Sequence, residues 1–514
     1  MILLPWILRV RAQDEGTSDA ARSTPARNRT MATQRTRPFG AAPVARIASL
    51  LLVCPLLLWG CGDGGSSPSA PDPTPPDPPA PPVTITSITV TVDQTEFEVG
   101  QTVTPQAQAI GSDGSVMQTS FTWSSTSPEV AVVSPTGQVR GRTAGATTIR
   151  ATAGGVTGSL DLAVAPMDLS DLLDQIRTER GLPALGGAIV TRDGLVGMAV
   201  VGDRRSGSGP PVTPDDRWHI GSNLKAITAA LAGVAVTRGE LSWDLTVEDA
   251  FPELDAVMRS DYRQVTLRDL LANRGRIRND PPGGTYAGPD ARTQREAMVE
   301  WALTAPPIGP FGEYHYSNPG FVIAGAMIER ALGGDFEDLL VSELMEPLGV
   351  TSLGWGPTTG AGGMDQPVGH RRSGGSWNPC EACDNPPGLS AAGRAHLSLG
   401  DWARVTQEFL LADQGHSSLI GPSHGRTLFT GLTPMSSAQN EYALGWIMTS
   451  RTWGGRTATH SGSNVSNHSV AWLGLDTGVA FLALTNAYQA GPEGSLDAVS
   501  AVVSALLAQW QELP

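Results

Sequence analysis

Residues 218–240 read WHIGSNLKAITAALAGVAVTRGE, in which a serine and a lysine stand at the start of an apolar run. The apolar run from residue 226 to residue 236 predicts a buried helix, with Gly221 and Ser222 at its start. Ser222 and Lys225 are three residues apart, so a helix places both side chains on one face. Ser222 also lies among backbone N–H groups at the positive end of the helix dipole. The pair predicts a serine nucleophile activated by a lysine base.

Lys225 is the only lysine among 35 basic residues, so arginine fills the other 34 positions. A GC-rich genome explains the arginines but not the single lysine. A desolvated lysine can lose its proton, whereas an arginine effectively cannot. In the alternative, Ser222 caps the helix and Lys225 is solvated, but a solvated cation at this position could equally be arginine. We therefore expect Lys225 to act as a base.

A second motif, Tyr316-Ser317-Asn318, precedes an apolar helix. The Tyr316 phenol can relay a proton between the serine and a leaving group, and the Asn318 amide can hold both the lysine and the substrate. Taken alone, an aromatic residue before a helix more often packs in the core. Tyr314 is a nearby competitor for the same role.

A third motif, His460-Ser461-Gly462, lies on a predicted edge strand that faces the serine. Gly462 would allow substrate to approach the backbone closely. The N–H groups of Ser463 and Ser222 could form an oxyanion hole, which stabilises a tetrahedral intermediate. A lone histidine in such a strand is more often a buried structural residue.

In this order and spacing, S-x-x-K, Y-x-N and H-x-G resemble the motifs of the serine β-lactamase and penicillin-binding-protein superfamily, most closely its class C-like branch. The resemblance covers roughly residues 168–511 and includes the stretches VTLRDLLANRGRI and YALGW, although LLANRGRI departs from the LLTHTSGL-like pattern that is usual in this family. It implies that Ser222 forms an acyl-enzyme, that Lys225 and Tyr316 share the acid and base roles, and that no metal or cofactor takes part. It also implies a set of substrate-binding residues: Asn318, His460, Gly462 and Ser463.

His460 stands where the β-lactamase motif has a lysine. A histidine is mostly neutral near pH 7, so it would not pair with the carboxylate of a β-lactam or of a peptide terminus. We expect a serine hydrolase that cleaves an ester, an amide or a D-amino-acid-containing peptide. One alternative is a true β-lactamase or DD-peptidase, and another is an inactive binding or adhesion protein of the cell envelope.

The expected partners are a small-molecule or peptide substrate, for which peptidoglycan fragments are one candidate, and a membrane. The net charge is −15, and no block of arginines forms a positive stripe. Nucleic acid is therefore not an expected partner.

Residues 167–514 read as an α+β domain. Residues 168–181 predict an opening helix, with Asp168 or Ser170 as its cap and Gly181 as its stop. Residues 186–203 predict a hairpin that turns at Asp193-Gly194. Residues 469–487 repeat this pattern, and residues 495–510 predict a closing helix. Strands from both ends of the domain should therefore pair in one antiparallel sheet, with a largely helical middle.

Residues 83–166 contain short runs rich in Thr, Val and Ile, separated by turn residues, which predicts a small β-sandwich. The segment around Gly137 and Gly145 resembles a group 2 bacterial immunoglobulin-like domain. Such a domain implies spacing or adhesion, and we expect a passive stalk.

Residues 1–61 read as an N-terminal extension with a lipoprotein-type signal, since Arg35, Arg37 and Arg46 precede the apolar run IASLLLVCPLLLW. Met31 is an alternative start. Residues 58–61 resemble a lipobox, which implies a lipid on Cys61, while ordinary cleavage or an uncleaved anchor are the alternatives. Residues 62–82 are a proline-rich linker. We expect an exported protein, anchored by lipid in the bacterial cell envelope.

Export would place Cys380 and Cys383 in an oxidising compartment, where this C-E-A-C pair most simply forms a disulfide. A zinc site would need two further ligands. A redox-active pair would need thioredoxin-like surroundings, which the sequence does not show.

Overall fold

The structure, a computed structural model, describes residues 81–513 except 208, 283, 438 and 492–493. The predicted signal, Cys61 and the linker up to residue 80 therefore lie outside the described residues.

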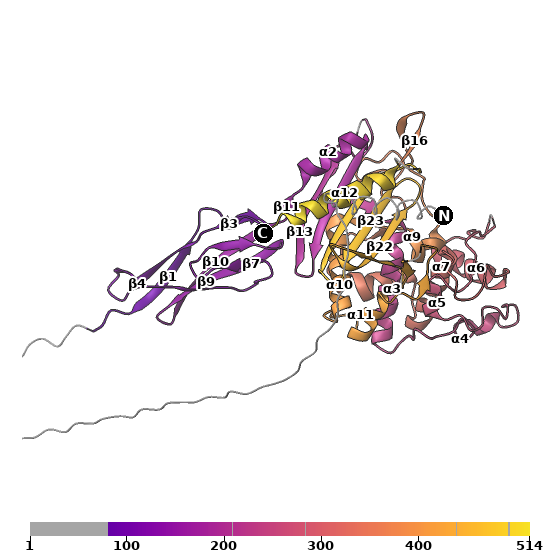
Figure 1. Cartoon of the computed structure of the whole chain (residues 1–514), viewed down its shortest axis with the longest axis horizontal. Coiled ribbons are helices and arrows are strands. Elements are labelled where there is room, and N and C mark those ends of the chain that lie inside the picture. Colours follow the sequence, from indigo (N-terminus) through magenta and orange to yellow (C-terminus); the bar gives the residue numbers. More distant parts are fainter. Residues whose placement is uncertain (1–80, 208, 283, 438, 492–493, 514) are drawn as a thin grey trace, which may run out of the picture. The chain divides into compact units, whose positions relative to one another are not determined.

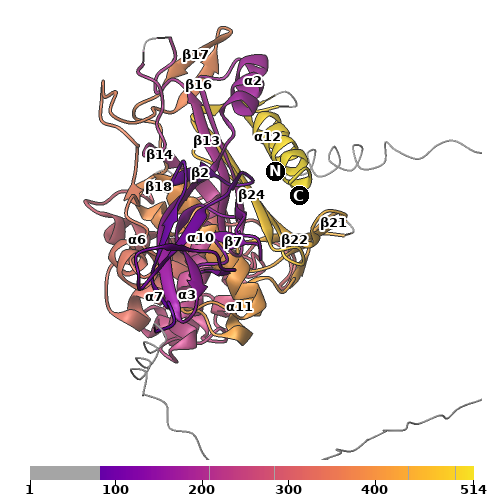
Figure 2. The same cartoon turned by 90° about the vertical axis from the view of Figure 1, so that its left-hand side faces the viewer.

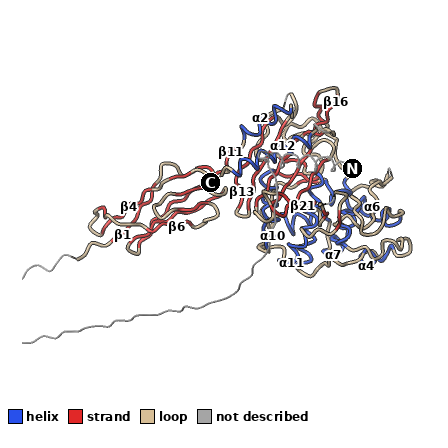
Figure 3. Tube along the Cα trace, viewed as in Figure 1, coloured by secondary structure: helices blue, strands red, loops and turns tan. Residues whose placement is uncertain are grey.

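Residues 85–165 form the predicted β-sandwich, in which every regular element is a strand (Figure 3). Ile149 and Ala151 of β9 and Leu162 and Val164 of β10 are buried, as expected for strands with one face on a core. Gly137 has a φ of +89°, and a Cβ there would lie 2.8 Å from the Trp123 ring. The three small sheets contain β1 (Ile85–Thr91), β4 (Gln106–Gly111) and β5 (Val116–Met117); β2 (Glu96–Glu98), β10 (Val156–Ala165), β9 (Gly145–Ala153) and β6 (Thr122–Ser125); and β3 (Thr102–Val103), β8 (Val139–Gly141) and β7 (Ala131–Val133).

The second region is built on a nine-stranded sheet. Strand β12, near the start of this region, pairs antiparallel with β24, near the end of the region. This confirms the predicted pairing of the two ends of the domain. The strands, in spatial order, are β11 (Met167–Asp168), β13 (Gly194–Gly202), β12 (Ala184–Thr191), β24 (Val479–Thr485), β23 (His468–Gly474), β22 (Gly455–Ser463), β21 (Ile447–Arg451), β20 (Glu441–Tyr442) and β19 (Thr433–Pro434).

Helices cover both faces of this sheet (Figures 1 and 2). Along β24, Phe481 and Ala483 enter the core formed with α2 (Ser170–Arg180) and α12 (Ser495–Gln511). The alternate residues Leu482 and Leu484 enter the other core, which contains α10 (Leu399–Gln414). This period of two gives β24 two apolar faces, as expected for a strand buried on both sides.

The middle of the domain is largely helical, as predicted. Every residue of α3 from Leu224 to Ala235 is buried, which is typical of a helix inside a core. Among the described residues, no helix combines the length and apolar character needed to cross a membrane. The elements are β14 (Arg217–His219), η1 (Gly221–Asn223), α3 (Leu224–Thr237), α4 (Val247–Ala250), η2 (Pro252–Leu254), α5 (Leu267–Leu271), α6 (Ala291–Thr304), α7 (Asn318–Leu332), α8 (Phe336–Leu340), η3 (Val341–Met345), β15 (Gly354–Trp355), β16 (His370–Ser373), β17 (Ser376–Pro379), η4 (Pro387–Leu389), α9 (Ser390–Gly393), β18 (Ala395–Ser398), α11 (Pro422–Leu428) and β25 (Ala487–Tyr488).

The prediction that His460 lies on an edge strand is wrong for the strand as a whole, because β21 and β23 flank β22. However, β21 pairs with β22 only as far as Thr459. Residues 460–463 pair with β23 alone. The end of β22 therefore keeps one open edge, which lies against η1.

Candidate active site

Ser222 lies in η1, directly before α3, and contacts two side chains that can move protons. The Lys225 Nζ atom lies 3.0 Å from the Ser222 Oγ atom. The Tyr316 hydroxyl donates a hydrogen bond to the same oxygen over 2.8 Å. The first two sequence motifs, 94 residues apart, therefore meet at one serine hydroxyl.

Lys225 is fully buried, and this burial holds the pKa of its amine well below the usual value. Its Nζ donates to the carbonyl of Ala392 over 2.7 Å. Two aromatic rings enclose the amine, with centroids 4.9 Å away for Tyr316 and 5.5 Å away for Phe321. Because desolvation penalises the charged form, this amine is suited to accept the serine proton.

Tyr316 has the opposite character, because burial raises the pKa of its hydroxyl above the usual value. The hydroxyl therefore stays protonated and can donate. Asn273 fixes the tyrosine from both sides: its carbonyl accepts from the His315 N–H over 2.8 Å, and its Oδ1 accepts from the Ser317 N–H over 3.0 Å. Asn273 belongs to the stretch LLANRGRI and has a positive φ of 53°.

Tyr314, the competitor named from sequence, packs against the Tyr442 ring with centroids 5.4 Å apart. In the part of the chain that the structure describes, no hydrogen bond joins it to Ser222. Geometry therefore favours Tyr316 as the proton donor.

Asn318 is the first residue of α7, and its backbone N–H donates to the Asn279 side chain over 2.8 Å. Within the described ranges, no hydrogen bond joins its side chain to Lys225 or Ser222. The Lys225 amine instead donates to the Ala392 carbonyl, so the role of Asn318 in holding the lysine and the substrate stays a prediction.

The end of β22 lies directly against the turn that carries Ser222. A Cβ on Gly462 would lie 1.9 Å from the Ile220 carbonyl oxygen and 2.8 Å from the Ser222 nitrogen. A Cβ on Gly221, whose φ is +51°, would lie 2.2 Å from the Ser463 nitrogen. The two glycines thus allow two backbones to meet, and this junction carries the Ser222 and Ser463 N–H groups of the predicted oxyanion hole.

His460 is buried beside Tyr316, with ring centroids 6.3 Å apart. Its Nδ1 lies 2.7 Å from the Ser461 carbonyl oxygen, so this nitrogen must carry the hydrogen. Its Nε2 then accepts from the Tyr442 hydroxyl over 3.1 Å. Burial, and secondarily the charge of Lys225, lowers the pKa of His460 to about 3. The ring is therefore neutral, and both nitrogens are engaged with protein groups rather than open to substrate.

Sequence reasoning misses several contacts of this site. A backbone carbonyl such as that of Ala392 has no signature in the sequence. Asn273 and Tyr442 lie in LLANRGRI and YALGW, which carry family resemblance but do not by themselves show a role for either residue.

Cys380 and Cys383 are joined in a disulfide in the structure.

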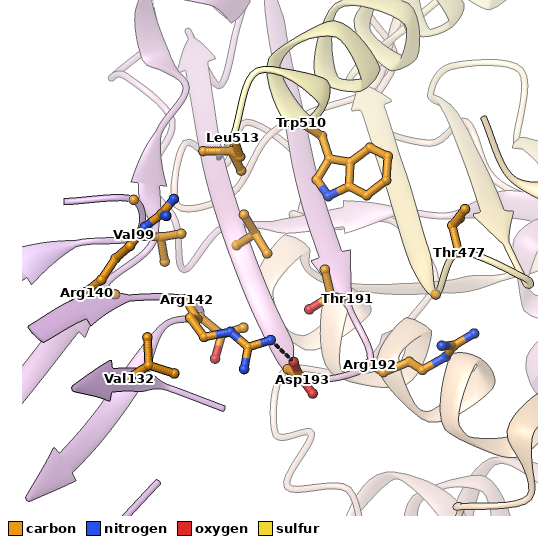
Figure 4. Close-up of a pocket in the computed structure, with 15 residues that line it drawn as sticks. Val99, Val132, Arg140, Arg142, Thr191, Arg192, Asp193, Thr477, Trp510 and Leu513 are labelled. Atoms are coloured by element: carbon orange, nitrogen blue, oxygen red, sulfur yellow. Dashed lines mark hydrogen bonds and ion pairs between the residues drawn. The ribbon is translucent and has the colours of Figure 1, made fainter. Parts of the chain in front are cut away.

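A separate pocket adjoins the turn between β12 and β13 (Figure 4). Its lining includes Arg140, Arg142, Arg192 and Trp510. The Arg142 guanidinium forms an ion pair of 2.9 Å with Asp193. Ser222, Lys225 and Tyr316 do not line this pocket, so it is distinct from the candidate active site.

Two family models match separate parts of this chain. A family model described as Beta-lactamase matches residues 169–505, and one described as Bacterial Ig-like domain (group 2) matches residues 84–164. Penicillin-binding protein 4 of Amycolatopsis lactamdurans is 30% identical over 34% of this chain and 46% of its own length. The unguisins hydrolase ungD' of Aspergillus campestris is 25% identical over 53% of this chain and 51% of its own length. The chain thus spans about half the length of these curated relatives.

Among solved structures, the octameric penicillin-binding protein homologue from Pyrococcus abyssi has a TM-score of 0.55 to this chain and is 21% identical to it. The match covers 66% of this chain and 76% of that one. At this identity the likeness concerns the fold alone.

Proposed function

Since this chain belongs to the beta-lactamase family, we propose that it is a serine hydrolase whose nucleophile is Ser222. One observation carries the proposal: the Ser222 Oγ atom lies within hydrogen-bond distance of both the Lys225 amine and the Tyr316 hydroxyl. A buried amine with a lowered pKa can accept a proton, and a half-buried phenol with a raised pKa can donate one.

In the acylation step, Lys225 takes the Ser222 proton while the Oγ atom attacks the carbonyl carbon of the substrate. The N–H groups of Ser222 and Ser463 stabilise the oxyanion. The Tyr316 proton passes to the leaving group, whose bond to the carbonyl carbon breaks, and an acyl-enzyme results. Lys225 then returns its proton to Tyr316. Water attacks the acyl-enzyme by the same transfers in reverse, which releases the acid and restores Ser222.

For the substrate we propose an ester, an amide or a D-amino-acid-containing peptide. Peptidoglycan fragments are one candidate for such a peptide. A neutral His460 offers no cation to a substrate carboxylate. This favours substrates without a carboxylate beside the reacting carbonyl over the β-lactams and peptide termini that a true β-lactamase or DD-peptidase would bind. The intact set of proton-transfer contacts argues against the third alternative, an inactive binding or adhesion protein.

We also propose that the protein is exported and anchored in the bacterial cell envelope by a lipid on Cys61, with the immunoglobulin-like domain as a stalk. The apolar run before Cys61 and the match to a group 2 bacterial immunoglobulin-like domain support this location. Globomycin treatment of expressing cells, compared with a Cys61→Ala variant, tests it through the mass and membrane fractionation of the protein. An unlipidated, freely released wild-type protein would refute it.

Turnover of p-nitrophenyl butyrate and of a chromogenic cephalosporin, each with wild type and Ser222→Ala, tests the function. We expect ester hydrolysis that is lost in Ser222→Ala, together with slow or absent cephalosporin hydrolysis. Cephalosporin turnover as fast as ester turnover would support the β-lactamase alternative. No reaction with any ester, amide or peptide, and no labelling by a fluorophosphonate, would refute the hydrolase proposal.

A further inference from the structure

A buried carboxylate, Asp384, contacts both backbone segments that carry the proposed oxyanion donors. Its side chain is 5% exposed, and its Oδ1 lies 2.8 Å from the His219 Nε2. The same oxygen accepts a hydrogen bond from the Asn464 Nδ2 over 3.2 Å. His219 comes shortly before Ser222, and Asn464 directly follows Ser463. One carboxylate oxygen therefore joins two segments that are distant in sequence.

On the serine side, the contact runs through the His219 ring. The His219 Nδ1 accepts a hydrogen bond from the Gly221 N–H over 3.1 Å. A ring nitrogen that accepts carries no hydrogen, so the Nε2 that faces Asp384 must carry it. The Asp384 carboxylate, 2.8 Å from this Nε2, favours the tautomer that can hold the Gly221 N–H through its negative charge. The Gly221 N–H belongs to the Ile220–Gly221 peptide, so this contact fixes the peptide unit directly before the one that presents the Ser222 N–H.

On the β22 side, Asn464 anchors the turn that follows Ser463. Its Nδ2 donates to Asp384 and also to the Cys383 carbonyl over 3.3 Å. Its Oδ1 accepts from the backbone N–H groups of Ser466 and Asn467 over 3.3 Å and 3.0 Å. The residue that follows Ser463 is thereby attached to the loop that carries Asp384.

The loop is itself held in place. Cys383, the residue before Asp384, forms the disulfide with Cys380. The Cys380 N–H donates to the Gly369 carbonyl over 2.7 Å. Asp384 is therefore presented by a short cross-linked segment rather than by an open loop.

Asp384 carries a charge despite its burial. Burial alone would raise the pKa of this carboxyl, but the contacts with His219 and the hydrogen bond from Asn464 outweigh it and hold the pKa below its usual value. The Arg394 guanidinium lies 3.6 Å from the other carboxylate oxygen. An ionised acceptor forms stronger hydrogen bonds than a neutral one.

We propose that Asp384 is a positioning residue that holds the two halves of the oxyanion hole in register, acting through His219 on Ser222 and through Asn464 on Ser463. The inference rests on the proposed acyl transfer at Ser222. It goes beyond the three motifs, because it adds a carboxylate that touches none of the reacting atoms.

The test compares Asp384→Ala and Asp384→Asn with a control, Asp401→Asn. Asp401 is also a buried aspartate and accepts hydrogen bonds from the Thr351 and Ser352 N–H groups over 2.9 and 2.8 Å. A fluorophosphonate titration first counts the competent sites in each preparation. The kcat and KM for p-nitrophenyl butyrate are then expressed per competent site. Affinity for an alkyl boronic acid, which mimics the tetrahedral intermediate, is measured in parallel.

Asp384→Ala should lower kcat per competent site by about 10- to 100-fold, somewhat less than the roughly 10²–10³ lost with an oxyanion donor itself. KM should change by less than about twofold, and boronate affinity should fall by a factor similar to that of kcat. Asp384→Asn, which keeps an acceptor oxygen, should recover part of the loss, and Asp401→Asn should leave kcat per site unchanged.

An unchanged kcat per competent site in Asp384→Ala, or a loss confined to the number of competent sites, would overturn the inference while leaving the hydrolase proposal intact. A wild-type protein that neither reacts with the fluorophosphonate nor turns over substrate would instead refute the hydrolase proposal itself.

Discussion

Lys225 connects an unusual amino-acid composition with the chemistry of the candidate site. The chain uses arginine at every other basic position, and the fold places this single lysine in full burial against Ser222. Arginine would keep its charge in such a place, whereas lysine can become neutral. Burial therefore explains both why this position holds a lysine and why the pKa of its amine is low.

Lys225→Arg should therefore abolish acylation, because a guanidinium cannot take the serine proton. A fall in ester turnover of about 10²–10⁴-fold is the usual contribution of a general base. Lys225→Met keeps the length of the side chain without a charge and controls for the cost of burying arginine. Circular dichroism verifies that both variants are folded. A Lys225→Arg variant with substantial activity would exclude the lysine as the base.

Tyr316 and Tyr314 form a matched pair of half-buried tyrosines two residues apart. Tyr316→Phe removes the hydroxyl that donates to Ser222, so kcat should fall by about 10²-fold or more. Tyr314→Phe should change kcat by less than about threefold, because Tyr314 contacts Tyr442 rather than the serine. Steady-state kinetics on one ester give kcat for both variants. A larger loss of kcat in Tyr314→Phe than in Tyr316→Phe would assign the proton transfer to Tyr314.

At the scale of elements, the site depends on how closely β22 approaches η1. A methyl group on Gly462 would collide with the Ile220 carbonyl oxygen. Gly462→Ala should therefore separate the two segments and lower kcat by about tenfold or more. Gly400→Ala is the control, since nothing lies within 4 Å of a Cβ there, and alanine in α10 should stabilise the fold slightly. Equal activities for the two variants would show that the β22–η1 contact does not shape the site.

The elements also show where sequence reasoning succeeds and where it stops. The α2 helix and its stop at Gly181, the hairpin at Gly194 and the closing α12 follow from local periodicity and turn residues, which a sequence displays directly. The pairing of β22 does not follow from local periodicity. The length of β21 decides which residues of β22 keep an open edge. Tertiary packing, which no local pattern encodes, brings the Ala392 carbonyl to the Lys225 amine and the Asp384 carboxylate to His219.

At the scale of the whole molecule, buried neutral histidines should make stability depend on pH. Burial is the largest cause that lowers the pKa of His460 to about 3 and those of His396 and His468 to about 4. An unfolded histidine has a pKa of about 6.5. Below that pH the unfolded chain binds protons that the folded chain does not, so the free energy of unfolding falls as the pH drops from about 6.5 towards 4.

Urea denaturation at pH 7.5, 6.5, 5.5 and 4.5 measures this fall, which approaches about 1.4 kcal/mol per pH unit for each histidine. Glu408 opposes the trend, since burial raises the pKa of its carboxyl. His468→Gln should flatten the slope between pH 6.5 and 4.5. Stability that is constant or rises on acidification would contradict the buried neutral state of these rings.

Ser222 is the proposed nucleophile, and covalent labelling gives the sharpest test of this role. The wild-type protein is treated with a fluorophosphonate, and its intact mass is measured by mass spectrometry. Trypsin then cleaves after Arg217 and after Lys225, which releases Ser222 in the peptide of residues 218–225. One label on this peptide, absent from Ser222→Ala, is the predicted result. A label on another serine, or equal labelling of Ser222→Ala, would contradict the claim.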